Sequence, residues 1–286
     1  MKIGITGSSG FVGKEFLKRT DHIEFVRINL RDETWEEQDF ADFDSVLHLA
    51  GKAHDMKNEN PSEYYEVNVN LTKKLLDKSI NSGVRQFIYV SSIKVYGDTV
   101  DGVINEKSPY NPTDDYGKSK QEAEELLLSS TDKISVAIIR PPLIYGPGVK
   151  GNMLKLVELA KKDIPLPFNN MGNARSMVSV GNLSSLISTI LDQKAEGIFL
   201  ASDGEAQSTT SLLKAIKDSL GLNHKLLSIP KFIISLLKLV KPSLHTRLYG
   251  NYVLDDSATR KQLNFTPNHT FEAGIKEMVE GYEPKL

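Results

Sequence analysis

The stretch KIGITGSSGFVGKEFLKR, residues 2–19, joins a short apolar run to an amphipathic run through a turn that contains Gly7, Gly10 and Gly13. This order predicts a strand, a tight turn and a helix. Glycines let the backbone of such a turn approach a pyrophosphate, and the unpaired N–H groups at the start of the following helix attract the anion. The sequence therefore predicts that this turn binds a dinucleotide.

Apolar and amphipathic runs continue to alternate along the next part of the chain. The apolar runs are rich in Val and Ile, and they are EFVRIN (24–29), SVLHLAG (45–51), QFIYVSS (86–92) and SVAIIRP (135–141). Their alternation with longer amphipathic runs predicts an α/β fold with a doubly wound parallel Rossmann sheet. Proline and glycine interrupt the rhythm after residue 146. We therefore predict a dinucleotide-binding domain over 1–145 and a smaller substrate-binding region over 146–286, of which some segments return to the first domain.

Composition excludes several classes of function. The 35 basic and 37 acidic residues are well mixed and give a formal net charge of −2, so no nucleic-acid partner is expected. The absence of cysteine excludes disulfides, thiolate catalysis and sulfur-ligated zinc, and no metal site is predicted. The N-terminal residues do not resemble a signal peptide, and the longest apolar-rich stretch, at 231–242, is too short to span a bilayer. We expect a cytoplasmic protein with no stable membrane insertion.

Tyr116 and Lys120 lie four residues apart in DDYGKSK, residues 114–120, and so one turn apart on a helix. A phenol titrates near about 10, and a neighbouring ammonium, aided by an oxidised nicotinamide, favours the phenolate. Ser92 follows a predicted strand, where open α/β sheets bind ligands, and Ser91 is the competing serine. We assign Tyr116 as general acid/base, Lys120 as its electrostatic modulator and cofactor-ribose ligand, and Ser92 as the hydrogen-bonding partner of the substrate oxygen.

The glycine spacing resembles the TGxxGFxG pattern of the extended short-chain dehydrogenase/reductase family. Further resemblances follow in order: HLAG (48–51), VNVNLTKKLL (67–76), YVSSIKVYG (89–97), YGKSK (116–120), RPPLIYGPG (140–148) and ARSMVSVGNL (174–183). The resemblance implies hydride exchange between a secondary alcohol carbon and a nicotinamide, mostly on nucleotide-linked sugars and often at C4. Together with the glycine turn, it places the following residues at the cofactor: Gly7, Ser9, Gly10, Phe11, Val12, Gly13, Leu49, Ala50, Gly51, Asn68, Tyr116 and Lys120.

Departures from the family pattern narrow the reaction. Sugar-nucleotide 4,6-dehydratases carry an Asp–Glu pair directly after the catalytic hydroxyl residue, where this chain has Ile93 and Lys94, so dehydration is disfavoured. Relatives that couple 3,5-epimerisation to reduction use a cysteine, and this chain has none, so that reaction is disfavoured too. Leu143 stands where many epimerases have an asparagine, and the short segment at 29–42 resembles 4-keto-sugar reductases. A 4-ketoreductase is therefore favoured over a 4-epimerase of a UDP- or dTDP-hexose in bacterial surface-polysaccharide synthesis, and both stay open.

Cofactor preference is predicted from the end of the second strand. NAD-specific relatives have an aspartate there that binds the ribose hydroxyls, whereas this chain has Asn29, Leu30 and Arg31. A guanidinium pairs with a 2′-phosphate. We therefore favour NADP(H) over NAD(H), with Arg31 as the first candidate ligand and Arg27 as the second.

Substrate contacts are predicted in the second half. Arg175 matches an arginine that relatives place against the nucleotide, and Asn152 and Arg247 are further candidates for the diphosphate. The apolar face of 231–241, with Phe232, Leu236, Leu239 and Val240, is expected to pack into the substrate region rather than on a membrane.

Two other functions remain open. One is a non-catalytic NAD(P) sensor, and the other is a small-carbonyl reductase. The resemblance also implies a homodimer, formed through helices expected at 65–82 and 115–129.

Overall fold

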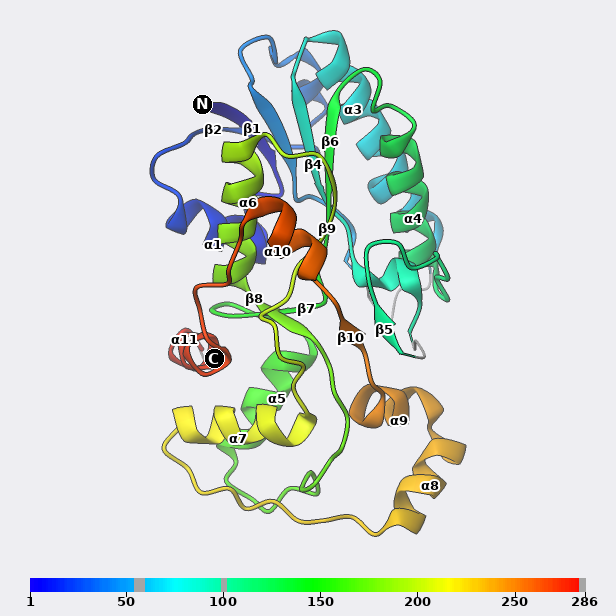
Figure 1. Cartoon of the computed structure of the whole chain (residues 1–286), viewed down its shortest axis with the longest axis vertical. Helices are drawn as coiled ribbons and strands as arrows, with labels where there is room; N and C mark the ends of the chain where they lie inside the picture. The colour runs from blue at the N-terminus through cyan, green and yellow to red at the C-terminus, as the bar shows by residue number, and fades with distance from the viewer. Residues whose placement is uncertain (54–59, 99–101, 283–286) are drawn as a thin grey trace.

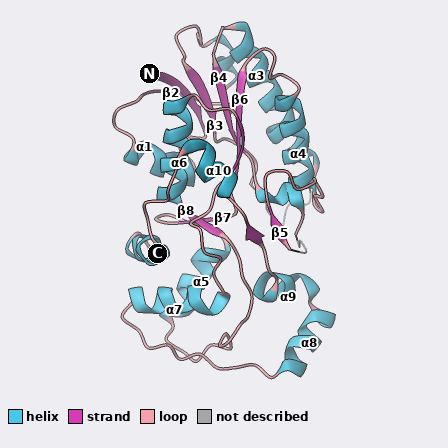
Figure 2. Cartoon of the chain, in the orientation of Figure 1, coloured by secondary structure: helices cyan, strands magenta, loops and turns pink. Residues whose placement is uncertain are grey.

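The structure, a computed structural model, describes residues 1–53, 60–98 and 102–282. Its centre is a six-stranded parallel sheet in the order β2–β1–β3–β4–β6–β9. The predicted doubly wound Rossmann sheet is confirmed (Figure 2). The strands are β1 (Lys2–Thr6), β2 (Glu24–Ile28), β3 (Ser45–His48), β4 (Gln86–Val90), β6 (Ser135–Arg140) and β9 (Gly197–Leu200).

Helices cover both faces of this sheet (Figures 1 and 2). Helices α1 (Phe11–Arg19) and α6 (Val180–Gln193) pack on one face, against side chains such as Ile5 and Ile139. Helices α3 (Leu71–Asn81) and α4 (Asp115–Leu128) pack on the other, against Phe87 and Ile138. Because successive strand residues point to opposite faces, the strands must be apolar on both sides. Residues 180–200, from the second half of the chain, add helix α6 to one face and strand β9 to the edge of this sheet.

The smaller region lies beyond the C-terminal ends of the strands (Figure 1). Its core joins β7 (Leu143–Tyr145), β8 (Met177–Ser179), α5 (Asn152–Lys161), α7 (Thr209–Ser219) and α11 (Phe271–Glu280). The remaining elements include α2 (Ser62–Tyr65), β5 (Val103–Ile104), α8 (Lys231–Val240), α9 (Pro242–Tyr249), β10 (Val253–Leu254) and α10 (Ser257–Leu263).

A buried charged network fixes the chain between β4 and α4. Arg140, the last residue of β6, donates from Nε to Glu124 Oε2 at 3.0 Å, and both side chains are almost fully buried. The Tyr110 hydroxyl donates to Glu124 at 2.8 Å, and Arg140 also hydrogen bonds Tyr96 and Tyr110. Tyr96 and Tyr110 belong to the segment that separates Ser92 from Tyr116. The network therefore holds the two catalytic candidates in a fixed relation.

The prediction that residues 231–241 pack their apolar face into the substrate region is wrong for the side chains that the structure describes. Phe232, Leu239 and Val240 are 72%, 81% and 64% exposed, and the side chain of Leu236 lies outside the described residues. The physical reason is that α8 packs chiefly on the next helix, α9, through another side. Across the described ranges, no helix combines the length and apolar character needed to cross a membrane.

Candidate active site

The turn after β1 is built from close backbone contacts. Gly7 has a φ of +67°, and a Cβ added at Gly13 would lie 2.4 Å from the Gly7 carbonyl oxygen. Gly10 is the N-cap of α1 and has no side chain that could accept hydrogen bonds from the N–H groups of the first helical turn. This backbone arrangement fits a pyrophosphate, which the helix N-terminus would attract. Ser9, Phe11 and Val12 share this turn and first helical residues.

The Gly13→Ala variant is expected to weaken dinucleotide binding by at least about tenfold, which corresponds to about 1.4 kcal/mol. The added methyl group collides with backbone, which cannot yield as a side chain does. Gly172→Ala is the matched control, because a Cβ at Gly172 meets nothing within 4 Å. Calorimetric titration with the oxidised dinucleotide measures both affinities. Equal affinities for the two variants would contradict this reading of the turn.

The loop after β3 is held by a chain of buried hydrogen bonds. Ala50 N donates to Thr6 Oγ1 at 3.1 Å, and Thr6 Oγ1 lies 2.7 Å from His48 Nδ1. His48 Nε2 lies 2.9 Å from Thr72 Oγ1, which donates to the Asn68 carbonyl. This order of donors assigns the Nε2–H tautomer to His48. The network ties Leu49, Ala50 and Gly51 to the glycine turn, as the cofactor assignment requires.

Because His48 is buried, we expect the folded protein to lose stability in acid. Burial, with a contribution from the charge of Lys120, lowers the pKa of His48 from 6.5 to about 3. Below about pH 6.5 the unfolded chain binds a proton that the folded protein excludes, so stability falls by up to about 1.4 kcal/mol per pH unit until about pH 3. Urea unfolding across this range should give a shallower pH dependence for His48→Gln than for the wild type. The exposed His22→Gln should match the wild type, and identical slopes for His48→Gln and His22→Gln would contradict the assignment.

Asn68 lies in a π-helical turn, η2 (Glu66–Asn70), and its side-chain amide is fully used by the protein. Oδ1 accepts from Lys52 N at 2.8 Å, and Nδ2 donates to Ser119 Oγ at 3.0 Å. Asn68 thus connects the loop after β3 to α4. A Cβ at Gly51 would lie 3.0 Å from Asn68 Oδ1 and 3.4 Å from Lys120 Nζ, so these three residues lie close together. π-turns of this kind are frequent at functional sites.

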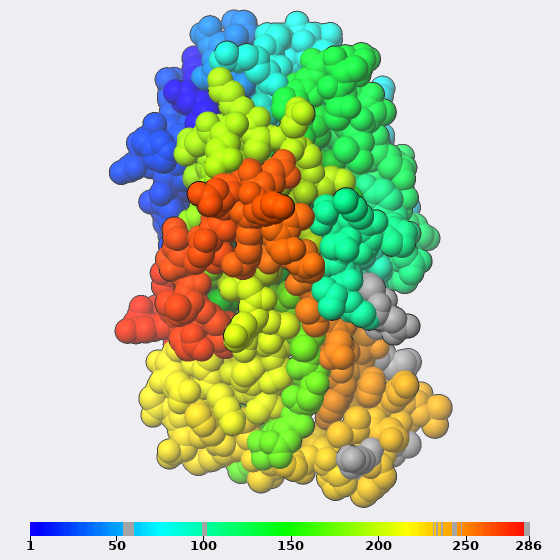
Figure 3. Space-filling view, viewed as in Figure 1, coloured from blue at the N-terminus to red at the C-terminus, as the bar shows by residue number. Residues whose placement is uncertain are grey.

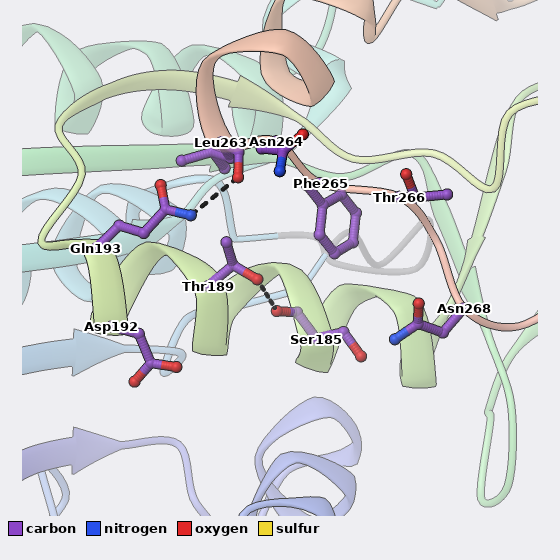
Figure 4. Close-up of a pocket in the computed structure, with 9 residues that line it drawn as sticks. All are labelled: Ser185, Thr189, Asp192, Gln193, Leu263, Asn264, Phe265, Thr266 and Asn268. Carbon is purple, nitrogen blue, oxygen red and sulfur yellow. Dashed lines mark hydrogen bonds between the residues drawn. The ribbon is translucent and has the colours of Figure 1, made fainter.

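Ser92, Tyr116 and Lys120 meet in one cavity of about 210 Å³. The other lining residues are Leu49, Gly51, Lys52, Ala53, Val90, Ser91, Pro141, Pro142 and Ile144. The cavity lies at the C-terminal ends of β3, β4 and β6, where open α/β sheets bind ligands. A larger cavity of about 510 Å³ lies between α6 and the chain after α10 (Figure 4). None of the predicted site residues lines that second cavity.

Burial favours the protonated form of the Tyr116 phenol at neutral pH. Burial raises the pKa of its phenol to about 12, and a hydrogen bond from Ser92 acts in the opposite direction. The prediction that Lys120, together with an oxidised nicotinamide, favours the phenolate concerns the cofactor-bound protein. In this structure the Lys120 ammonium donates to the Tyr89 hydroxyl at 3.0 Å and to the Val90 carbonyl at 3.1 Å. Burial lowers the pKa of Lys120 to about 8. The protein alone therefore holds Tyr116 as a proton donor.

Two contributors to the site, Tyr89 and Tyr64, were missed from the sequence, and Ser91 was considered there only as the competing serine. Tyr89 accepts a hydrogen bond from Lys120 and lies under its ammonium, 4.4 Å from Nζ to the ring centroid. The ring of Tyr64 lies 5.9 Å from that of Tyr116. Ser91 Oγ is buried without a hydrogen-bond partner in the described part of the protein, and Ser91 lines the cavity. The available signal was the hydroxyl group of Tyr89 in the buried strand QFIYV.

Lys94 has a structural role in place of dehydratase chemistry. Its Nζ lies 2.8 Å from Asp114 Oδ2 and also contacts Asp98. Asp114 caps α4 by accepting from Gly117 N at 2.7 Å. The ion pair therefore connects the turn after Ser92 to the first turn of the helix that carries Tyr116.

The predicted substrate and adenosine contacts are not among the residues that line the cavity of Ser92, Tyr116 and Lys120. Arg31 and Arg27 are exposed near the end of β2, and Asn152 is exposed at the start of α5. Arg175 is half-buried, and its Nη1 donates to the Thr246 carbonyl of α9 at 3.3 Å. Arg247 belongs to α9, but its side chain lies outside the described residues.

Comparisons with known proteins identify the family. The sequence model described as "NAD dependent epimerase/dehydratase family" matches residues 3–200. UDP-glucose 4-epimerase from Vibrio cholerae is 37% identical over 309 aligned positions, which cover 97% of this chain and 94% of that protein. N-acetyl-alpha-D-glucosaminyl-diphospho-ditrans,octacis-undecaprenol 4-epimerase from Escherichia coli O157:H7 is 33% identical over 213 positions, covering 68% and 64%.

Solved structures of similar fold include another sugar-nucleotide epimerase. The crystal structure of UDP-glucuronic acid 4-epimerase from Bacillus cereus in complex with NAD gives a TM-score of 0.78 at 18% identity, with 98% of each chain covered. At this identity the likeness shows the fold alone, and the family is shown by the sequence matches. The chain therefore belongs to the NAD-dependent epimerase/dehydratase family, within the extended short-chain dehydrogenases/reductases.

Proposed function

We propose that the protein acts at C4 of a UDP- or dTDP-linked hexose, as a nicotinamide-dependent 4-epimerase or 4-ketoreductase. The observation that carries the proposal is that Ser92, Tyr116 and Lys120 line one cavity at the C-terminal ends of the strands. The names of the two relatives favour epimerisation. The protonated phenol favours the reductase as the second candidate, because reduction of a ketone consumes a proton at the substrate oxygen.

The residues divide the work as follows. When bound, the nicotinamide accepts or delivers the hydride. Ser92 hydrogen bonds the C4 oxygen and fixes its position, and Tyr116 transfers the proton to or from the same oxygen. Lys120 binds the cofactor ribose, and its charge stabilises the phenolate that remains after the proton has left. Asn68 and Tyr89 are positioning residues, because their polar atoms bind protein groups around Lys120.

One incubation separates the two reactions. An epimerase retains its cofactor, so UDP-glucose and UDP-galactose should interconvert without added nicotinamide. A 4-ketoreductase should instead consume reduced nicotinamide stoichiometrically with a UDP-4-keto sugar. Failure of both reactions with UDP- and dTDP-hexoses would overturn the proposal.

The finer assignments are part of the same proposal. We propose NADP(H) over NAD(H) for two reasons. Arg31 is exposed just after β2, and the chain has Asn29 near the place where NAD-specific relatives have an aspartate. Comparing the affinities of the two dinucleotides, with Arg31→Ala as the variant, tests this preference. We assign the substrate diphosphate to Arg175, with Asn152 and Arg247 as further contacts. A cytoplasmic homodimer formed through α3 and α4, serving surface-polysaccharide synthesis, completes the proposal.

A further inference from the structure

An exposed apolar surface lies on α8, away from the candidate active site. Phe232 and Leu239 are seven residues apart, so they lie on the same face two turns apart, and they are 72% and 81% exposed. Val240 adds a third side chain that is 64% exposed. Single exposed apolar residues are ordinary, but three large ones on a helix of ten residues form a surface suited to a partner.

The segment that carries this surface has charged residues of one sign. Residues 219–254 contain no Asp or Glu and five basic residues, namely Lys225, Lys231, Lys238, Lys241 and Arg247. Of these, Lys225 is paired with Asp163 at 2.6 Å. The chain as a whole carries a net charge of −2, so this segment is a strong local exception. Lys238 and Lys241 are exposed directly beside Leu239 and Val240.

The shape of this part of the protein leaves the surface accessible. Helices α8 and α9 form one end of the molecule, far from the N-terminal strands (Figure 1). In the space-filling view they make up the orange lower right edge (Figure 3). Ile234 and Leu237 are half-buried on the other side of α8, which packs chiefly on α9. The helix thus has half-buried apolar side chains on one side and a separate exposed apolar face on the other.

We propose that this face docks the protein on the surface of an anionic phospholipid bilayer. A short helix with apolar side chains on one face and lysines beside them binds in the interface plane, because the apolar groups enter the acyl boundary while the lysines contact anionic headgroups. A second copy of the chain fits less well. A symmetric contact would place each cluster of lysines against its own copy, without an acidic residue in the segment to neutralise it.

Docking at α8 would hold the catalytic cavity at the membrane surface. Arg175 donates to the Thr246 carbonyl of α9, and Tyr252, shortly after α9, donates from its hydroxyl to the carbonyls of Ile93 at 2.7 Å and Gly97 at 3.1 Å. These contacts connect the α8–α9 pair to the segment that follows Ser92. The proposal requires no particular sugar substrate, and it stands or falls independently of the reaction proposed above.

Vesicle co-sedimentation of the full chain tests the proposal. The wild type should bind vesicles of phosphatidylcholine with phosphatidylglycerol, and binding should weaken with added salt. The Phe232→Ser/Leu239→Ser variant should bind at least about tenfold more weakly, and each of Lys238→Gln and Lys241→Gln about fivefold more weakly. Val103→Ser is the matched control, because Val103 is 59% exposed on β5, outside the surface. Tyr116→Phe should bind as the wild type does.

Other outcomes would overturn the proposal. They are failure of the wild type to bind anionic vesicles, equal binding to pure phosphatidylcholine, and wild-type binding by the Phe232→Ser/Leu239→Ser variant. Sedimentation velocity supplies the remaining check. If the wild type does not bind vesicles and the double variant changes from dimer to monomer, the face is an interface between copies of the chain.

Discussion

Replacing Tyr116 by phenylalanine is expected to lower kcat by about 10²- to 10⁴-fold, because the hydroxyl that transfers the proton is removed. The ring remains, together with its contact to Tyr64, so folding should be preserved. Dinucleotide affinity should stay close to that of the wild type, since the glycine turn and Lys120 are unchanged. Steady-state kinetics and calorimetric titration measure the two quantities on the same preparation.

Tyr65→Phe is the matched control for this variant. It makes the same chemical change on a different helix, α2, where the Tyr65 hydroxyl donates to Asp115 Oδ1 at 3.3 Å. Tyr65 does not line the cavity that contains Tyr116. Its kcat should remain within about twofold of the wild-type value, because only a partly exposed hydrogen bond is lost. An equal loss of kcat in both variants would point to disruption of the packing between α2 and α4 rather than to removal of a proton donor.

Glu124→Gln is expected to destabilise the protein by about 3–5 kcal/mol, the cost of leaving a buried charge without its partner. The exposed fractions of the Arg140 and Glu124 side chains are only 2% and 0%. The variant keeps the volume of the side chain but leaves the Arg140 guanidinium without a counter-charge. Urea unfolding at neutral pH measures the difference. Activity should fall with stability, since the network holds the segment between Ser92 and Tyr116.

Glu125→Gln provides the control, because Glu125 is exposed on the same helix and should change stability by less than about 0.5 kcal/mol. A double variant, Glu124→Leu/Arg140→Met, should recover part of the loss, because replacing both charges by apolar groups removes the desolvation penalty. A double variant less stable than Glu124→Gln alone would show that hydrogen bonding to Tyr96 and Tyr110 outweighs charge pairing.

The sequence predicted the sheet and the proximity of Ser92, Tyr116 and Lys120, because both depend on local patterns. Strands that are apolar on both faces, the glycine turn after β1 and the i, i+4 spacing of Tyr116 and Lys120 are all readable within a few residues of one another. The position of Ser92 at the end of β4 follows from the parallel sheet, since parallel strands end at a common edge.

Contacts between residues far apart in the sequence could not be predicted from such local patterns. The hydrogen bonds from Thr6 through His48 to Thr72 join residues 42 and 24 positions apart. The burial that raises the Tyr116 pKa and the contact of Lys120 with Tyr89 were not predicted, because both depend on three-dimensional packing. The exposure of Phe232 and Leu239 was likewise hidden, because an apolar helical face has the same pattern whether it meets a core or a solvent-exposed surface.

Rapid mixing of the dinucleotide-loaded protein with UDP-glucose or UDP-galactose, followed by the absorbance of reduced nicotinamide, tests the central claim most directly. We predict that reduced nicotinamide forms within a single turnover in the wild type and that its formation is slowed by about 10²-fold or more in Tyr116→Phe. Equal rates in the two proteins, with both loaded with dinucleotide and nucleotide sugar, would contradict the role of Tyr116 and the account built on it.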